Sequence, residues 1–123
     1  MNKKVILIIE DNEMNMEMAA FLLEREGMTV LKAENGEQGI NIALKKIPDI
    51  ILADLQLPII DGFEVCKTLK ETPVTSHIPI VAFTAQLMED DKRKAYSSGC
   101  IAIICKPIEV REFAKSIMGY IKE

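Results

Sequence analysis

The sequence predicts an α/β fold in which a doubly wound sheet of five parallel strands carries helices on both faces. Five short apolar runs, rich in isoleucine and valine, recur along the 123 residues, and stretches with helical spacing separate them. Runs that are apolar on both faces are typical of strands buried in a parallel sheet. Alternating strands and helices join through right-handed crossovers, which place helices on both sides of the sheet.

The five strands are expected at the apolar runs, each four or five residues long. They cover residues 5–9, 29–33, 50–53, 80–83 and 101–104. Pro48, Pro79 and Pro107 lie at the edges of these runs, where a missing N–H does not interrupt the hydrogen bonding of a sheet.

Helices are expected between the strands, and two stretches carry the clearest helical spacing. In one stretch, apolar residues fall at i, i+3, i+4 and i+7, namely Ile40, Ala43, Leu44 and Ile47. The same spacing continues over three turns between residues 110 and 121. Met14 and Met18 share one face of the first helix, and we interpret them as core residues.

Two helix starts carry the residues expected of N-caps. Asn35 with Gln38, and Asp61 with Glu64, resemble capping residues followed three positions later by a side chain that bonds back to the cap. We therefore expect the second and third helices to begin directly after Asn35 and Asp61.

The fourth helix is expected to be held weakly. Acidic residues precede basic ones, which suits the helix dipole and predicts Glu89–Arg93 and Asp90–Lys94 ion pairs. Few apolar residues anchor this helix, so it is a candidate for movement.

Composition and charge narrow the function classes. The chain is 49% hydrophobic and 28% charged, so we expect residues 1–123 to form one globular domain. Its net charge of −4 argues against binding to nucleic acid or to an anionic membrane. No run approaches the roughly 20 apolar residues of a membrane span, and the first apolar run is too short for a signal peptide. The sequence therefore predicts a cytoplasmic protein.

The three cysteines, Cys66, Cys100 and Cys105, all lie in apolar contexts. A disulfide framework normally uses an even number of cysteines, and no spacing here matches a zinc site. We interpret all three as buried thiols.

Polar residues follow the predicted strands, at the sheet edge where ligands of such folds bind. Glu10 and Asp11 follow the first strand, Asp54 the third, Thr84 the fourth and Lys106 the fifth. In the flavodoxin-like strand order 2-1-3-4-5 the first and third strands are neighbours, so three carboxylates should converge. Because like charges repel, we expect a divalent ion such as Mg2+, or an ammonium, among them.

This set of groups suits phosphoryl transfer. The carboxylates and a divalent ion, the Lys106 ammonium and the Thr84 hydroxyl are the parts needed to hold a phosphoryl group on a carboxylate. Such transfer depends mostly on positioning and charge neutralisation, and an aspartate can be the nucleophile.

Four motifs occur in order, each after an apolar run. They are Glu10-Asp11-Asn12, Ala53-Asp54 with Pro58, Asp61 and Gly62, Phe83-Thr84-Ala85, and Cys105-Lys106-Pro107. In this combination the sequence resembles the receiver domain of response regulators in two-component signalling. The resemblance covers essentially the whole chain.

The resemblance implies that Asp54 accepts a phosphoryl group from the phosphohistidine of a histidine kinase or a phosphotransfer protein. Asp11 and Asp54 would bind Mg2+ directly and Glu10 through water. The backbone carbonyl of Gln56 would be a further metal ligand.

The resemblance also implies that Thr84 and Lys106 contact the phosphoryl oxygens and that the Lys106–Pro107 bond is cis. Such a protein is not an enzyme with a separate substrate, although it catalyses its own phosphorylation and slow dephosphorylation. It would signal to a downstream protein through the fourth helix, fifth strand and fifth helix, as a monomer or weak dimer.

One position departs from the family pattern. Ile103 stands where receivers usually carry a Tyr, Phe or His that switches rotamer together with the threonine. The aromatic part of the switch is therefore missing or replaced. Gln56 and Gln86, two residues beyond Asp54 and Thr84, occupy positions that in the family tune the access of the dephosphorylating water.

Several alternatives remain open. The chain ends directly after the fifth helix, so it resembles stand-alone receivers, but a receiver excised from a hybrid histidine kinase has the same features. A receiver that signals without being phosphorylated is a third possibility. A flavodoxin-type electron carrier would need a Ser/Thr/Gly-rich loop in place of Glu10-Asp11-Asn12-Glu13. An aspartyl phosphohydrolase would need a second acid near Asp54 and a substrate cap.

Overall fold

Five parallel strands form one sheet in the order β2-β1-β3-β4-β5, as predicted. The structure is a computed structural model that describes residues 3–85 and 88–121. The elements in chain order are β1 (Val5–Ile9), α1 (Glu13–Arg25), β2 (Thr29–Ala33), α2 (Gly36–Lys46), β3 (Ile50–Asp54), α3 (Gly62–Glu71), β4 (Ile80–Thr84), α4 (Glu89–Ser97), β5 (Ala102–Cys105) and α5 (Phe113–Gly119).

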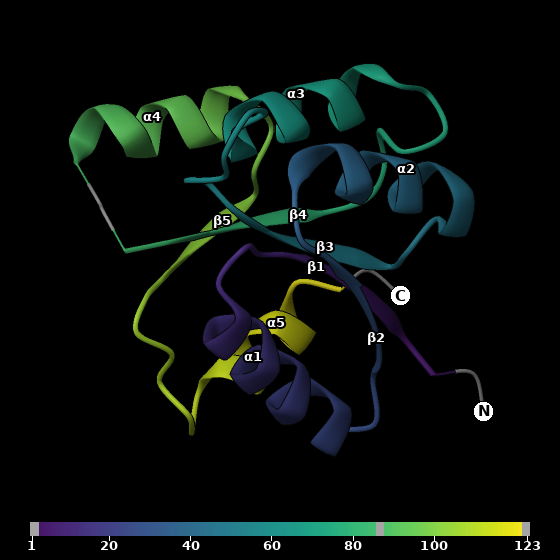
Figure 1. The fold of residues 1–123 in the computed structure, drawn as a ribbon, viewed down its shortest axis with the longest axis vertical. Helices are drawn as coiled ribbons and strands as arrows, with labels where there is room; N and C mark the ends of the chain where they lie inside the picture. The colour runs from purple at the N-terminus through teal and green to yellow at the C-terminus, as the bar shows by residue number, and fades with distance from the viewer. Residues whose placement is uncertain (1–2, 86–87, 122–123) are drawn as a thin grey trace.

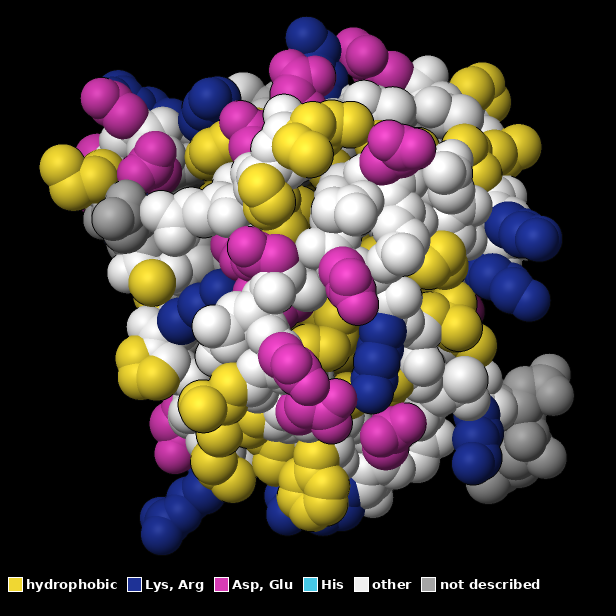
Figure 2. Space-filling view, viewed as in Figure 1, with side chains coloured by type: hydrophobic (Ala, Val, Ile, Leu, Met, Phe, Trp, Pro, Cys, Tyr) yellow, Lys and Arg dark blue, Asp and Glu magenta, His cyan; other side chains and the backbone are white. Residues whose placement is uncertain are grey.

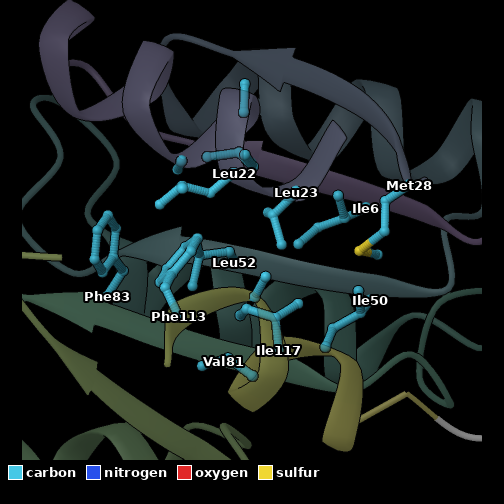
Figure 3. Packing of buried hydrophobic residues seen from close by; sticks show 14 of the residues in the cluster. Ile6, Leu22, Leu23, Met28, Ile50, Leu52, Val81, Phe83, Phe113 and Ile117 are labelled. Atoms are coloured by element: carbon cyan, nitrogen blue, oxygen red, sulfur yellow. The ribbon is translucent and has the colours of Figure 1, made fainter. Parts of the chain in front are cut away.

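The sheet separates two helical layers. Figure 1 shows α1 and α5 on one face and α2, α3 and α4 on the other. Each face has its own apolar core. Figure 3 shows the core between the sheet and the two helices α1 and α5, where Leu22 and Leu23 of α1 lie near Phe113 and Ile117 of α5. Among the described residues, no helix is long and apolar enough to cross a bilayer.

The central strands are buried on both faces, as the apolar runs predicted, but the edge strands are not. Every residue of β3 and β4 is buried. In β2 only Ala33 is fully buried, and in β5 only Ala102. The prediction was wrong for these two strands because each has a neighbour on one side only.

Three strands end one residue later than predicted. β3 extends to Asp54 and β4 to Thr84, because these residues continue the parallel pairing with Phe83 and Cys105. β5 begins at Ala102 and ends at Cys105. Asp54 and Thr84 are thus held by the sheet itself, which places their side chains more rigidly than a loop would.

Some predicted helical residues lie outside the core. α5 is shorter than its apolar spacing suggested, and Val110 precedes it with a largely exposed side chain. Tyr120 N–H donates to Ile117 O, a tight final turn that ends the helix. Ile47 closes α2 in a left-handed conformation with φ of 45° and is exposed.

The predicted caps are present. The Asn35 side chain accepts from Gln38 N–H and the Asp61 side chain from Glu64 N–H. Gln38 Oε1 accepts from Glu34 N–H, at 2.6 Å, so its side chain bonds back to the residue before the cap rather than to Asn35 itself. Both helices therefore begin where the sequence predicted.

Two predictions about helix surfaces were wrong. In α4 the ion pairs are Glu89–Lys92, at 3.6 Å, and Asp90–Arg93, so each spans three residues rather than four. Met14 and Met18 are not core residues: 75% of Met14 and 43% of Met18 is exposed. They form an open apolar surface with Phe21 on α1, which Figure 2 shows as yellow side chains low on the face.

Candidate functional site

Three carboxylates meet at the carboxyl ends of β1 and β3, as predicted. Ile9 of β1 pairs with Ala53 of β3, so the residues that follow, Glu10 and Asp54, lie side by side. Oxygen atoms of Glu10, Asp11 and Asp54 all lie within 4.8 Å of one another. Glu10 and Asp54 are buried and Asp11 is exposed. The cluster is therefore open to solvent on the side of Asp11.

Lys106 places its ammonium between the two buried carboxylates. Its Nζ lies 2.8 Å from Glu10 Oε1 and 3.0 Å from Asp54 Oδ2. The backbone of Lys106 is fixed to β4, since Lys106 N–H donates to Thr84 O at 2.8 Å, and the Lys106–Pro107 bond is cis. The cis bond matches the expectation from the family resemblance.

Both oxygens of Asp54 are held in place. Oδ1 accepts from Gln56 N–H at 2.8 Å, and Oδ2 accepts from Lys106 Nζ at 3.0 Å. The loop after β3 folds back onto the strand, where Gly62 N–H donates to Leu55 O. A Cβ at Gly62 would collide with the carbonyl oxygen of Asp54. This close approach explains why glycine follows Asp61.

Thr84 ends β4 and is buried one strand away from Asp54. It lines a cavity of about 180 Å3 together with Leu55, Gln56, Phe63 and Asp91. Asp91 belongs to α4, so the cavity lies between the acidic cluster and that helix. Gln86, the second glutamine singled out in the sequence, lies outside the described residues.

Burial and charge shape the electrostatics of the cluster. Burial raises the pKa of Glu10, and the neighbouring Asp54 adds to this, while Lys106 and the Asn12 N–H oppose it. Burial by itself lowers the pKa of Lys106, but Glu10 and Asp54 outweigh it, so the pKa of Lys106 is raised. The ammonium therefore stays charged at neutral pH.

The donor set of the cluster fits a hard divalent cation. Three carboxylates offer oxygen ligands, and two of them, Glu10 and Asp11, border a groove of about 390 Å3. Its lining also includes Glu13, Lys32 and Glu34. Oxygen ligands and room for water are the requirements of Mg2+. One ammonium does not balance three carboxylates, so a cation would relieve the remaining repulsion.

Two phenylalanine rings contact lysine side chains, and neither contact was predicted from the sequence. The ring of Phe83 lies beneath Lys106, with Nζ 4.9 Å from its centroid. The pairing of Phe83 with Asp54 across β3 and β4 could have signalled this. Lys94 Nζ of α4 lies 4.4 Å from the centroid of the Phe63 ring of α3. This contact joins two helices, and no local sequence pattern predicts it.

Ile103 is half-buried and packs with the core beneath α3 and α4. It therefore packs an aliphatic side chain at the position where receivers usually carry an aromatic residue. α4 is held weakly, as predicted, because Ala95 is its only buried residue.

The cysteines divide into a pair and a single exposed residue. Cys66 and Cys100 are buried, and their sulfur atoms lie 3.1 Å apart. Cys105 is exposed, so the prediction of three buried thiols was wrong for this residue. It ends β5 at the edge of the sheet, where one side has no neighbouring strand.

Comparison with known proteins gives a consistent result. A family model described as the response regulator receiver domain matches residues 6–118. The polar-differentiation response regulator DivK of Brucella anthropi is 40% identical over 118 residues, covering 96% of each chain.

Solved structures agree with this assignment. The chemotaxis protein CheY4 of Vibrio cholerae has the same fold, with a TM-score of 0.93 at 22% identity, covering 98% of this chain and all of its own. The receiver domain of the sensor histidine kinase PA1611 from Pseudomonas aeruginosa has a TM-score of 0.89 at 25% identity, covering 97% of this chain and 98% of its own. That structure holds a magnesium ion in its active-site cleft. The chain described here belongs to the response regulator receiver domain family of two-component signalling.

Proposed function

We propose that residues 1–123 form one receiver domain that accepts a phosphoryl group on Asp54 from the phosphohistidine of a histidine kinase or phosphotransfer protein. The observation that carries this proposal is the carboxylate cluster with Lys106 Nζ 3.0 Å from Asp54 Oδ2. The likeness to DivK-type response regulators supports a donor of this kind.

The transfer needs little beyond positioning. An Asp54 carboxylate oxygen attacks phosphorus, the P–N bond to the donor imidazole breaks, and the imidazole nitrogen keeps the electron pair and takes up a proton. Gln56 N–H and Lys106 Nζ hold the two carboxylate oxygens in fixed directions, so the nucleophile is oriented before the donor arrives. Lys106 and the Thr84 hydroxyl would then contact the phosphoryl oxygens.

We propose Glu10, Asp11, Asp54 and the Gln56 carbonyl as the residues that hold Mg2+, with Glu10 acting through water. When bound, Mg2+ would offset the negative charge of the carboxylates and of the incoming phosphoryl group. The acidic donor set and the magnesium ion in the PA1611 receiver domain support this choice.

Intact-protein mass spectrometry tests the acceptor. The wild type is incubated with Mg2+ and a small-molecule phosphodonor, and it should gain one phosphoryl group. Asp54→Asn should gain none, and EDTA should prevent the gain in the wild type. Asp61→Asn is the matched control, because Asn also caps α3, and it should be modified like the wild type. An unmodified wild type under every donor would favour a receiver that signals without phosphorylation.

We further propose that the phosphorylated protein signals through α4, β5 and α5. α4 has one buried residue, and its Asp91 shares a cavity with Thr84, so a shift of Thr84 toward a phosphoryl group would disturb this helix first. Amide chemical shifts measured before and after phosphorylation test the surface. Changes confined to α1, α2 and α3 would contradict it.

Self-catalysed dephosphorylation would proceed by water reaching Asp54 past the exposed Gln56.

A further inference from the structure

A pair of buried thiols lies outside the carboxylate cluster and has no part in the proposed phosphoryl transfer. Cys66 belongs to α3, and Cys100 lies between α4 and β5, 34 residues along the chain. Their sulfur atoms are 3.1 Å apart, and both side chains are almost fully buried. A disulfide bond is about 2.05 Å long, so the two sulfur atoms would have to approach by about 1 Å to form one.

The local backbone brings the two sulfur atoms together. Cys100 N–H donates to Ala95 O, which turns the chain directly after α4. Gly99 makes this turn with φ of +110°, and a Cβ there would lie 2.5 Å from Lys70 Cγ. Only glycine lets the chain approach α3 this closely, so the turn presents Cys100 to Cys66 rather than to solvent.

The surroundings favour reaction at Cys66. A hydrogen bond from Cys100 lowers the pKa of the Cys66 thiol, although burial opposes this, and the nearby Lys70 ammonium lowers it further. The reactive form of cysteine is the thiolate. A groove of about 400 Å3 between α3 and α4 is lined by Lys67 and Gly99, the chain neighbours of the two cysteines. The thiols themselves are buried beside it, so the proposed reaction requires an oxidant small enough to pass between these side chains.

We propose that Cys66 and Cys100 are a redox pair that forms an intramolecular disulfide when the protein meets hydrogen peroxide. In the first step the Cys66 thiolate attacks a peroxide oxygen, the O–O bond breaks, and a sulfenic acid and one water form after protonation. In the second step Cys100 sulfur attacks the sulfenic sulfur, and its proton leaves with the hydroxyl group as a second water. Two thiols lose two electrons, and the peroxide is reduced to two waters.

The disulfide bond would restrict the movement of α4. It closes a loop that contains all of β4 and α4, and it ties the end of α4 to α3. α4 has one buried residue, and its Lys94 contacts Phe63 of α3. Oxidation would therefore stiffen α4, whose Asp91 lines the cavity beside Thr84, independently of whether Asp54 is phosphorylated.

The test uses hydrogen peroxide as the oxidant and Cys105→Ser as the background, because the exposed Cys105 thiol would otherwise react. Intact mass should fall by two hydrogens, and digestion should yield one peptide pair joined through Cys66 and Cys100. Cys66→Ala and Cys100→Ala in the same background should show no such loss. Dithiothreitol should restore the original mass.

Thermal unfolding gives a second readout in case the alanine variants fold poorly. The oxidised protein should unfold at a temperature about 10 °C higher than the reduced protein, since the closed loop restricts the unfolded chain. The proposal is overturned if both thiols stay reduced at a peroxide concentration that oxidises Cys105 in the wild type. Sulfinic acid at either cysteine without a cross-link, or a bond to Cys105 instead, would overturn it equally.

Discussion

The ammonium of Lys106 lies 3.0 Å from Asp54 Oδ2, across 52 residues of chain. This contact joins the end of β3 to the segment after β5, and the same ammonium reaches the buried Glu10. The acidic cluster is thus partly neutralised by the protein itself. Contacts within the protein therefore hold Glu10, Asp54 and Lys106 together at the carboxyl edge of the sheet.

Lys106→Met should destabilise the metal-free protein by about 3 kcal/mol at neutral pH, because it leaves buried carboxylates without their cation. Burial raises the pKa of Glu10 above its ordinary 4.5, and losing Lys106 raises it further. The loss of stability is fully present above this raised pKa. It disappears below 4.5, where Glu10 is protonated in both the folded and the unfolded protein. Chemical denaturation in EDTA across the acidic range measures this.

At alkaline pH, the stability difference between wild type and Lys106→Met depends on the protonation of Lys106 rather than of Glu10. The pKa of Lys106 is raised above its ordinary 10.5 by Glu10 and Asp54, against the effect of burial. Its stabilisation is fully present below 10.5 and is lost as pH rises through the folded value. The difference between wild type and Lys106→Met should therefore be widest between these limits. Adding Glu10→Gln to Lys106→Met should recover much of the stability, and a lack of recovery would point to lost packing instead.

Asp11→Asn should stabilise the metal-free protein by about 1 kcal/mol, because it removes one of three like charges whose oxygens lie within 4.8 Å. The same change should remove most of the stabilisation that Mg2+ confers on the wild type. Thermal unfolding with EDTA and with millimolar Mg2+ measures both effects. Glu24→Gln is a suitable control: this exposed acid on α1 lies outside the cluster and outside the groove beside it, and both quantities should stay unchanged.

Gly62→Ala should cost about 2 kcal/mol or more, because the new Cβ meets the backbone of Asp54 and Leu55. The variant should also accept a phosphoryl group more slowly, since the displaced backbone carries the acceptor. Gly119→Ala is the matched control: its Cβ meets nothing within 4 Å, so it should raise stability by about 0.5 kcal/mol. Equal effects at the two glycines would contradict the close approach at Gly62.

Ile59→Asn should stabilise the protein by about 1 kcal/mol. Ile59 is fully exposed and has a φ of +68°, which is costly for a β-branched residue and well tolerated by asparagine. Val74→Asn is the control, because Val74 is also exposed but is not in the left-handed region. Denaturant unfolding compares the two variants, and a loss of stability in Ile59→Asn would mean that the Ile59 side chain makes a favourable contact.

Much of the fold and of the cluster could be predicted from the sequence because both depend on local signals. Glu10 and Asp54 follow buried apolar runs, and the parallel order of the strands then places them together. The missed features depend on contacts between distant segments. The Cys66–Cys100 pair requires the turn at Gly99, and the Phe63–Lys94 contact requires the packing of two helices. Periodicity also cannot tell an edge strand from a central one, which is why the exposure of Cys105 was missed.

Met88→Ser should stabilise α4 by about 1 kcal/mol. Met88 is the N-cap of this helix, is 68% exposed, and makes no side-chain capping hydrogen bond. A serine hydroxyl there can accept from a free N–H of the first turn. Amide hydrogen exchange within α4 should slow by about five-fold, with little change in α1. Met14→Ser is the control, because Met14 is equally exposed on α1 but is not a cap. If exchange slows equally in α1 and α4, the helix opens only together with the whole fold, and α4 is then a rigid part of the domain rather than its most mobile helix.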